Sequence, residues 1–391
     1  MKTVANNQQT RHVFNPTVRV QTSILRAQDP FGFHKKLPGY APTRLVNAAN
    51  LAVLLGVKHV WVKDEEARLG LPAYKILGAG WATYRALEAH CGTLEPWTGV
   101  EELRAKLEPF KPLTLACATD GNHGRAVARM AKLLGLDAEI LVPNNMVAVR
   151  IEAIKSEGAR VTVVNGGYDE TVRQSSRLAS ANCLVISDTG WEGYDDVPRW
   201  VSEGYQTIYR EVDAELERLG AKQPDLVAVQ IGVGALACSV VAHYQPLGSS
   251  IVAVEPTGAA CVLASIEAGE CVQLEGDLET IMSGLNCGTP SPVAWPLMRD
   301  GIRAFVAIPD QMAEQAMRLL ADAGVISGES GAAGLGGLLQ LLTGPDALEN
   351  RERLGITEDS SVLVISTEGA TDPETYRRII GSSAENPWRI K

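Results

Sequence analysis

The chain has 391 residues, of which 46% are hydrophobic and 21% charged, a balance typical of a globular protein with a sizeable core. Its net charge is −10 and no block is rich in lysine or arginine, which argues against nucleic acid or an anionic membrane surface as the main partner. At about 150 residues per domain, this length predicts two or three domains.

The sequence pattern also argues against a membrane-spanning, a secreted and a metal-binding protein. No run approaches about 18 uninterrupted apolar residues, so no transmembrane helix is expected. The first thirty residues are polar, with Asn7, Gln8, Gln9 and Arg11 where a signal peptide needs an apolar centre, so we expect a cytoplasmic protein. The seven cysteines form no CxxC pair or Cys/His cluster, so no metal site is expected.

The predicted elements follow an α/β rhythm. Residues 1–40, rich in Pro, Asn and Gln, are predicted to form an irregular arm. From Pro42, short runs of Val, Ile and Leu alternate with amphipathic stretches of helix length, which is typical of parallel sheets covered on both faces. Nine strands are predicted, at 60–62, 113–117, 139–142, 161–164, 184–187, 226–231, 251–255, 305–308 and 362–366.

Nine strands are more than one compact sheet usually holds, so we expect two three-layer α/β domains with mainly parallel sheets. Linker-like composition at 91–112 and 219–225 places a small α/β domain at 91–221, made of four strand–helix units. Residues 1–90 and 222–391 would then form the large domain, with an active site in the cleft between the two.

Lys75 lies where a loop is predicted to meet a helix. After it, Leu77, Trp81, Tyr84 and Leu87 recur at steps of three and four residues, so one face of this helix is expected to be buried. A desolvated lysine has its ammonium form disfavoured, and its neutral amine can attack a carbonyl. The alternative is a lysine that merely reaches solvent from a partly covered helix start, which is the commoner fate.

A polar loop, residues 118–124 (Ala-Thr-Asp-Gly-Asn-His-Gly), follows the strand 113–117 and precedes a helix expected to begin near Arg125. Thr119, Asn122 and the first N–H groups of the helix could hold a carboxylate or a ring oxygen. A carboxylate beside an anion site has a raised pKa and suits acid/base work, so Asp120 is a candidate. An N-cap is the alternative role for Asp120.

A second turn, residues 230–237 (Gln-Ile-Gly-Val-Gly-Ala-Leu-Ala), also leads from a strand into a helix and could direct backbone N–H groups at a phosphate. Glu255 ends the next strand, twenty-one residues after Gly234, which keeps a NAD-dependent dehydrogenase open as an alternative. Against it, no third glycine or alanine stands in register.

Two more loops end predicted strands. Residues 187–194 hold Asp188 with two glycines and two aromatic residues, and either a binding loop or a solvated turn fits this composition. In residues 365–372, the hydroxyls of Ser366 and Thr367 could bond to a heterocycle nitrogen, although a polar strand-end loop has the same composition. A lysine, a phosphate-binding turn and such a hydroxyl together describe a pyridoxal phosphate site.

From about Pro42 to Arg378 the chain resembles the tryptophan synthase β/threonine dehydratase group of pyridoxal-phosphate enzymes, known as fold type II. The resemblance is carried by residues 42–45, 62–65, 73–78, 119–124 and 232–236. It implies that Lys75 forms the Schiff base with pyridoxal 5'-phosphate and that Asn122 faces the cofactor's ring oxygen. It further implies a set of phosphate-binding residues: Gly232, Val233, Gly234, Ala235 and Leu236. Ser366 or Thr367 would meet the pyridine nitrogen.

Within that group the chain is most similar to the diaminopropionate ammonia-lyases, because Asp120 stands where the dehydratases have Ser or Ala, and because of residues 188–194. This resemblance implies elimination from D- or L-2,3-diaminopropionate to pyruvate and two ammonia, with Lys75 taking the α-proton of the L-isomer and Asp120 that of the D-isomer. Thr119, Asp120, Asp188 and Tyr168 would contact the substrate.

The same resemblance implies a homodimer, and a Cys261/Cys287 pair similar to one that forms a disulfide in the family. A cytoplasmic location argues against a permanent bond there. Three alternatives to the lyase stay open: a serine/threonine dehydratase, a NAD-dependent dehydrogenase and a non-catalytic module that binds an amino acid.

Overall fold

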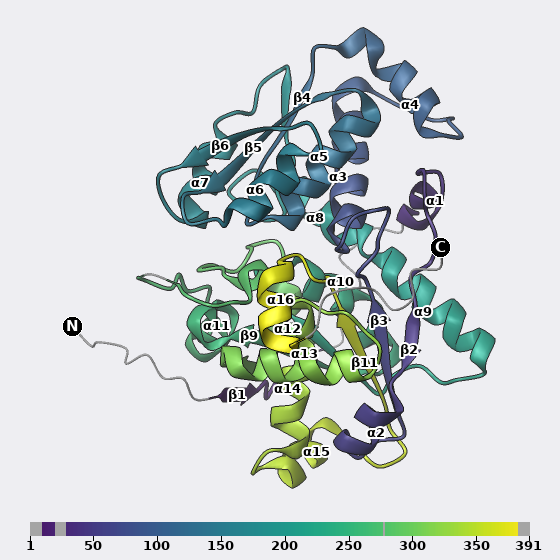
Figure 1. The fold of residues 1–391 in the computed structure, drawn as a ribbon, viewed down its shortest axis with the longest axis vertical. Helices are drawn as coiled ribbons and strands as arrows, with labels where there is room; N and C mark the ends of the chain where they lie inside the picture. The colour runs from purple at the N-terminus through teal and green to yellow at the C-terminus, as the bar shows by residue number, and fades with distance from the viewer. Residues whose placement is uncertain (1–9, 20–28, 277, 382–391) are drawn as a thin grey trace.

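Two sheets organise the computed structural model, which describes residues 10–19, 29–276 and 278–381 (Figure 1). A seven-stranded sheet has the order β1-β10-β9-β8-β11-β3-β2, and a four-stranded sheet has the order β6-β5-β4-β7. In Figure 1 the smaller sheet lies in the upper lobe and the larger sheet in the lower lobe, each with helices around it. The predicted fold class is therefore confirmed.

The larger sheet has a parallel centre and antiparallel edges. From edge to edge its strands are β1 (Arg11–Phe14), β10 (Ala304–Ile308), β9 (Ser250–Pro256), β8 (Leu226–Gln230), β11 (Ser361–Ser366), β3 (His59–Asp64) and β2 (Leu45–Asn47). The central strands β8, β10 and β11 are buried throughout, which is why they are continuous apolar runs. The register of β11 on β3 sets Ser366 beside Asp64, so both strands end at the same edge.

The smaller sheet is parallel throughout and consists of β4 (Thr114–Ala118), β5 (Asp137–Pro143), β6 (Arg160–Val164) and β7 (Cys183–Val185). Each strand is followed by a helix, respectively α5 (Asn122–Leu134), α6 (Ala148–Lys155), α7 (Tyr168–Ser176) and α8 (Asp196–Gly204). The four predicted strand–helix units are therefore present.

Most of the remaining helices surround the larger sheet, whereas α3 (Lys75–Cys91) and α4 (Val100–Leu107) pack in the upper lobe (Figure 1). The others are α1 (Pro30–Lys35), α2 (Ala49–Leu55), α9 (Gln206–Leu219), α10 (Ala235–Tyr244), α11 (Cys261–Ala268), α12 (Trp295–Gly301), α13 (Asp310–Asp322), α14 (Glu329–Thr343), α15 (Ala347–Leu354) and α16 (Pro373–Ile380). Helix α3 packs against α5 and α8, and α14 lies under β8, β9 and β11. Its glycines and alanines let α14 approach the sheet closely; a Cβ on Gly337 would lie 2.4 Å from Val254.

All nine predicted strands are present, with ends that differ by a few residues. The prediction of an irregular arm at 1–40 was wrong where the chain is described, because Arg11–Phe14 pairs with β10 and Pro30–Lys35 forms α1. Residues 1–9 and 20–28, which include Asn7, Gln8 and Gln9, lie outside the described residues. The helix predicted near Arg125 begins at Asn122. The proposed linker 91–112 contains α4.

The domain boundaries at 90/91 and 221/222 remain predictions. Among the described helices, none is both long and apolar enough to span a membrane.

Candidate active site

One cavity collects the ends of strands from both sheets. Loops that follow β4, β7, β8 and β11 reach it, together with the first residues of α3. Every site residue predicted from the sequence, except Ser366, lines this cavity, which we call the inner cavity. The lining residues are Tyr74, Lys75, Thr119, Asp120, Gly121, Asn122, His123, Arg150, Tyr168, Asp188, Gln230, Gly232, Val233, Gly234, Ala235, Leu236, Ser283, Gly284, Leu285, Cys287, Ser330, Thr367 and Glu368.

Lys75 is the first residue of α3, and its ammonium is held inside the cavity. Its Nζ donates a hydrogen bond to Asp188 Oδ2 at 2.7 Å, and only 17% of the side chain is exposed. Burial alone would lower the pKa of Lys75, but the Asp188 carboxylate outweighs it and raises that pKa well above its usual range. The predicted burial is thus present, whereas the predicted loss of the ammonium form is wrong, because desolvation comes with a counter-ion.

Close helix packing fixes the first turn of α3. A Cβ on Gly78 would lie 2.6 Å from the Tyr205 ring, and a Cβ on Gly204 would lie 2.5 Å from the carbonyl oxygen of Leu77. The Tyr74 and Tyr205 rings lie 4.7 Å apart, centroid to centroid. The Tyr74 N–H donates to the Thr367 carbonyl at 3.1 Å. Lys75 therefore starts from a backbone held by α8, by α9 and by the loop after β11.

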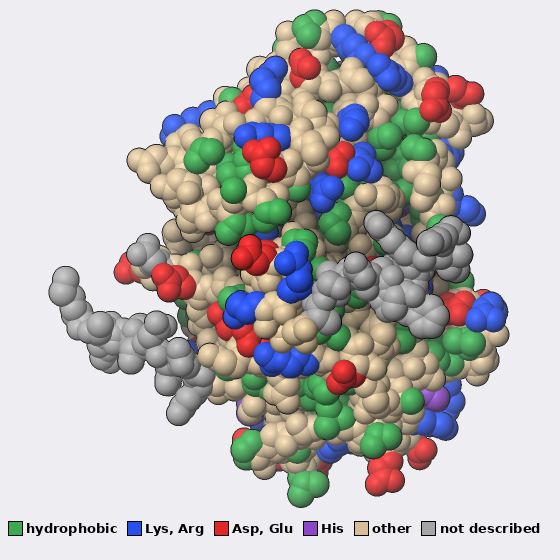
Figure 2. Space-filling view, viewed as in Figure 1, with side chains coloured by type: hydrophobic (Ala, Val, Ile, Leu, Met, Phe, Trp, Pro, Cys, Tyr) green, Lys and Arg blue, Asp and Glu red, His purple; other side chains and the backbone are tan. Residues whose placement is uncertain are grey.

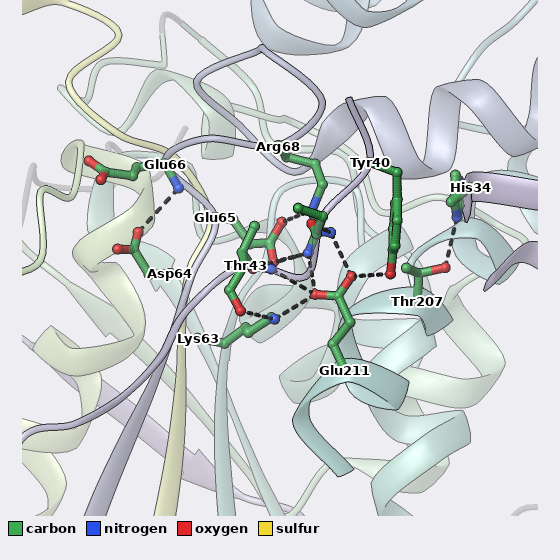
Figure 3. A network of polar contacts seen from close by, with 11 residues as sticks. His34, Tyr40, Thr43, Lys63, Asp64, Glu65, Glu66, Arg68, Thr207 and Glu211 are labelled. Carbon is green, nitrogen blue, oxygen red and sulfur yellow. Dashed lines mark hydrogen bonds and ion pairs between the residues drawn. The ribbon is translucent and has the colours of Figure 1, made fainter. Parts of the chain in front are cut away.

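A buried network of four charges anchors the loop that leads to Lys75 (Figure 3). Arg68 donates to Glu65 at 2.6 Å and to Glu211 at 2.6 Å, and Lys63 donates to Glu211 at 2.6 Å. The side chains of all four are at most 1% exposed. The Thr43 hydroxyl also donates to Glu65 at 2.7 Å. Two cations facing two anions, each with several hydrogen bonds, are the conditions under which buried charge is tolerated.

Asp188 is the charge centre of the cavity. Besides Lys75, it accepts a hydrogen bond from the Tyr168 hydroxyl at 3.2 Å. Burial alone would raise the pKa of Asp188, but the Lys75 ammonium lowers it far below its usual range, so Asp188 is ionised. His123 pairs its Nε2 with the Ile186 carbonyl at 2.7 Å, and its Nδ1 lies 3.9 Å from Asp188 Oδ2. Burial lowers the pKa of His123, which favours the neutral ring there.

Asp120 is not the N-cap of α5, so that alternative is wrong. The cap position is Gly121, and the Thr119 hydroxyl oxygen accepts from the N–H groups of Gly121 and Gly124, both at 2.9 Å. Within the described part of the chain, no hydrogen bond or ion pair engages the Asp120 carboxyl. Burial raises the pKa of Asp120 to about 7, with Arg150 lowering it and Asp188 raising it further. Such a group can gain or lose a proton near neutral pH.

Asn122 joins the two lobes across the cavity. Its Nδ2 donates to Glu368 Oε2 at 2.5 Å, and Glu368 Oε1 accepts from the Ser330 N–H at 3.3 Å. Glu368 was not predicted as a site residue, although it lies in the 365–372 loop. The signal available in the sequence was a carboxylate directly after the two predicted hydroxyls.

The turn after β8 has the form of an anion cradle. Gly232 to Leu236 lead into α10, and Gly234 has a φ of 109°, which favours glycine. A Cβ on Gly234 would lie 2.5 Å from Met298 Sδ, and one on Gly232 would lie 3.0 Å from the Gly284 carbonyl oxygen. The first N–H groups of a helix have no partner within it, so here they are free to bind a phosphate.

The two hydroxyls after β11 differ in position. Thr367 lines the cavity, and its Oγ1 accepts from Gln230 Nε2 at 2.8 Å. Ser366 is fully buried and donates instead to Ser327 Oγ at 2.9 Å, outside the lining. The hydroxyl that faces the cavity is therefore that of Thr367.

Two other sequence features are accounted for elsewhere. Glu255 accepts from the N–H groups of Val262 and Leu263, both at 2.8 Å, so it caps α11, which removes the support for a ribose contact. Cys261 and Cys287 are buried free thiols, so the disulfide suggested by the family is absent from the structure. Among the described side chains, no group of three or more His, Cys, Asp or Glu is arranged to hold a metal ion.

Comparison with known proteins identifies the family. The family model described as "Pyridoxal-phosphate dependent enzyme" matches residues 36–368. The chain belongs to this family. It is 39% identical over 359 residues to the diaminopropionate ammonia-lyase of Escherichia coli (strain K12), which covers 89% of each chain. The crystal structure of the Escherichia coli enzyme in complex with D-serine superposes with a TM-score of 0.87 at 36% identity, covering 95% of this chain and 97% of the other.

A second set of relatives is more distant. The L-serine dehydratase/L-threonine deaminase of Mus musculus is 32% identical over 212 residues, which cover 53% of this chain and 61% of that protein. The predicted resemblance to the pyridoxal-phosphate enzymes, with the diaminopropionate ammonia-lyases as the near relatives, is thus confirmed.

The cofactor of this family member is pyridoxal phosphate, and the residues around the cavity fit it. The glycine turn before α10 provides N–H groups for the phosphate, in a place that a larger residue would fill. Lys75 provides an amine, and Thr367 a hydroxyl, in the same cavity.

Proposed function

We propose that this chain catalyses the elimination of ammonia from 2,3-diaminopropionate, in its D or L form or both, to give pyruvate and two ammonia. One observation carries the proposal: Lys75 and Asp120, which has no partner among the described residues, line the same cavity as a phosphate-type turn. An amine and a carboxylate from different segments match a carbon–nitrogen lyase with two stereochemical options, in which the amine takes a proton only in its neutral form. The similarity to diaminopropionate ammonia-lyases over most of the chain supports it.

The proposed cofactor contacts use the chain's own groups. Lys75 would hold pyridoxal phosphate covalently, and residues 232–236 would bind its phosphate through backbone N–H groups. Asn122 would donate its amide to the ring oxygen, and the Thr367 hydroxyl would meet the pyridine nitrogen without protonating it. When bound, the cofactor supplies an electron-withdrawing ring that stabilises negative charge at the α-carbon of the substrate.

Proton transfer would then divide between two side chains. Lys75, as the neutral amine, would take the α-proton of the L-isomer. Asp120 would take the α-proton of the D-isomer, from the opposite side. Asp120 suits this role because its pKa of about 7 leaves it able to accept a proton near neutral pH. Asp188 would keep the Lys75 amine in position through their hydrogen bond.

Selection of a diamino acid would rest on negative charge in the cavity. Asp120 and Asp188 can meet the second ammonium of 2,3-diaminopropionate, a group that serine and threonine lack. Tyr168 would assist by orienting Asp188, to which it donates a hydrogen bond. Thr119 would shape the loop that meets the substrate carboxylate, because its hydroxyl holds two N–H groups of that loop.

A serine/threonine dehydratase is the second candidate, supported by the similarity to that class over about half of the chain. Asp120 favours the lyase, because the dehydratases that the sequence resembles have Ser or Ala at this position. We further propose that the protein works as a homodimer in the cytoplasm, as the sequence predicts.

The test is an assay of the purified, cofactor-loaded protein with D- and L-diaminopropionate, D- and L-serine and L-threonine. Pyruvate or the matching keto acid and ammonia are measured separately. We expect two ammonia per pyruvate from diaminopropionate, and a kcat/KM for at least one of its isomers well above that for serine or threonine. Faster turnover of serine than of diaminopropionate would favour the dehydratase, and no product from any of these substrates would refute both.

A further inference from the structure

A second cavity, which we call the outer cavity, adjoins the inner one and shares part of its wall. Asp120, Arg150 and Ser283 line both. This outer cavity has a volume of about 350 Å³, enough for a small amino acid. Its sides come from the loop after β5, the start of α6, residues 278–286, the start of α14 and one face of α16. Figure 2 shows acidic and basic side chains gathered between the two lobes, around the place that α16 has in Figure 1.

Glu329 lines this outer cavity and has no ion-pair partner among the described residues, although Arg150 is near enough to lower its pKa. It begins α14 and is only 3% exposed. Over residues 10–19, 29–276 and 278–381, it has no ion pair, and the hydrogen bond that acts on its carboxyl comes from its own backbone N–H. Burial and the neighbouring Glu368 raise the pKa of Glu329 to about 7. A buried carboxylate is costly unless a cation meets it, so the place is suited to a cation from outside the chain.

Arg150 supplies the opposite charge at the shared wall. It donates to the Ser283 hydroxyl and lies over Gly121, whose Cβ would be 3.2 Å from Arg150 Cδ. No ion pair of Arg150 occurs within the described ranges, whereas Arg378, the other cation of the cavity, lies 3.6 Å from Glu314. Among the described residues that line it, the outer cavity thus offers one cation, Arg150, and one buried carboxylate, Glu329, that form no ion pair. This pair is complementary to a molecule that carries a carboxylate and an ammonium.

We propose that the outer cavity is a capture site for the diamino acid on its way to the inner cavity, in which Glu329 meets the second ammonium of the substrate, the one that serine lacks, and Arg150 meets its carboxylate. This inference rests on the proposed function and names a specificity residue, Glu329, outside the groups assigned to the chemistry. Asp372 and Glu279 also line the cavity, so the surrounding charge favours a cationic substrate over a neutral one. Discrimination would therefore begin before the substrate reaches Lys75.

The first test replaces Glu329 by glutamine, which keeps the shape and removes the charge. We expect Glu329→Gln to lower kcat/KM for diaminopropionate about fivefold to tenfold at low salt while kcat is unchanged, since the lost interaction acts on capture. The dependence of kcat/KM on ionic strength should become flatter. The inhibition constant of D-serine, which has no second ammonium, should be the same in the variant as in the wild type.

A second pair of variants does not touch a buried group. Asn145 is exposed and lines the same cavity. Asn145→Lys should lower kcat/KM for diaminopropionate and Asn145→Asp should raise it, each without a change in kcat or in Tm. The matched control is Glu349→Gln on exposed α15, which should leave every constant unchanged.

The proposal is overturned if Glu329→Gln lowers kcat as much as kcat/KM, or if it weakens the binding of D-serine by the same factor as that of diaminopropionate. It is also overturned if both Asn145 variants behave like the wild type. A Glu329→Gln protein that fails to fold leaves the decision to the Asn145 pair. Failure of the proposed function gives a different result, because the wild type itself would then release no pyruvate from diaminopropionate.

Discussion

Asp120 is half-buried and has no hydrogen-bond or ion-pair partner among the described residues, and this sets its pH behaviour. Its pKa of about 7 lies above the ordinary value of 3.8, so the carboxyl is protonated below about pH 7 and ionised above it. Only the ionised form accepts a proton from the substrate. We therefore expect kcat/KM for D-diaminopropionate to fall as the pH drops through about 7, a fall that a pH–rate profile of the wild type would measure.

Asp120→Asn extends this prediction. Loss of a general base costs about 10²- to 10⁴-fold, so turnover of the D-isomer should fall by that factor while much of the L activity remains. The measurement is kcat/KM for each isomer. Equal losses for both would show that Asp120 does not act on one isomer alone.

Lys75→Ala should abolish both activity and the visible absorbance of bound cofactor, because the amine that holds it covalently is gone. The spectrum of the purified variant after incubation with pyridoxal phosphate and dialysis is the measurement. Lys155→Ala, at an exposed lysine on α6, is the control and should keep the wild-type spectrum. Retention of the absorbance in Lys75→Ala would place the link on another lysine.

The sequence was enough to select the site residues but not to predict which of them bond to one another. Lys75, Asp120 and Asp188 stand out because each follows or precedes a strand or helix end. That Lys75 keeps its charge could not be predicted, because Asp188 is 113 positions away and meets it only in the fold. The choice between Ser366 and Thr367 likewise depended on which side of the loop faces the cavity.

Among the elements, α3 and α8 pack closely against each other near the site. Gly78→Ala would force a methyl group to within 2.6 Å of the Tyr205 ring and 2.8 Å of the Val201 carbonyl oxygen. We expect a loss of about 1–3 kcal/mol in the free energy of unfolding. Weaker binding of pyridoxal phosphate should accompany it, because the start of α3 must shift. Urea unfolding and a cofactor titration measure the two effects.

Gly99→Ala is the control for this contact. A Cβ at Gly99, before α4, meets only the end of a flexible glutamate side chain at 3.4 Å. Its cost should be below about 1 kcal/mol, and cofactor binding should be unchanged. An equally stable Gly78→Ala protein would show that α3 and α8 can separate without harm.

Strands with apolar runs were predictable, and the two short edge strands of the larger sheet were not. Most of the nine predicted strands are buried, where burial demands runs of Val, Ile and Leu, and β6 and β7, the edges of the smaller sheet, have such runs although they are less buried. Strands β1 and β2 are four and three residues long and lie at the edges of the larger sheet. Their partners, rather than their own composition, make them strands, as the antiparallel pairing of Arg11–Phe14 with β10 illustrates.

At the scale of the whole molecule, the network around Glu211 joins segments that are far apart in the chain. Glu211 on α9 binds Lys63 in β3 and Arg68 in the loop before α3, 148 and 143 positions away. Glu211→Gln would leave two buried cations short of a partner. We expect a loss of about 3–5 kcal/mol in the free energy of unfolding, measured by chemical denaturation. Glu349→Gln, at an exposed pair, should cost less than about 0.5 kcal/mol.

The pH dependence of this network has a defined sign. Burial would raise the pKa of Glu211, but Arg68 and Lys63 lower it below the ordinary 4.5. The contribution of Glu211 to stability is therefore complete above pH 4.5 and is lost as the pH falls through the lowered value. A wild type and a Glu211→Gln protein that lose stability in parallel on acidification would contradict this.

The two-sheet architecture was predictable from the order of strands and helices, because each parallel strand needs a crossover helix. The network was not, since its four charged residues come from three segments and show no pattern in the sequence. Residues 62–65 drew attention only through their family resemblance. Their burial became visible once β3 was placed inside the larger sheet.

The shared wall of the two cavities has a consequence for inhibitor design. A ligand with an amino-acid head in the inner cavity and a short tail past Asp120, carrying a carboxylate for Arg150 and an ammonium for Glu329, would bind in both cavities at once. Linking the two parts in one molecule adds their contacts while the entropy of association is lost only once. Such a compound would draw its selectivity from the outer cavity, where its tail meets Glu329, rather than from the cofactor that the enzyme shares with its whole family.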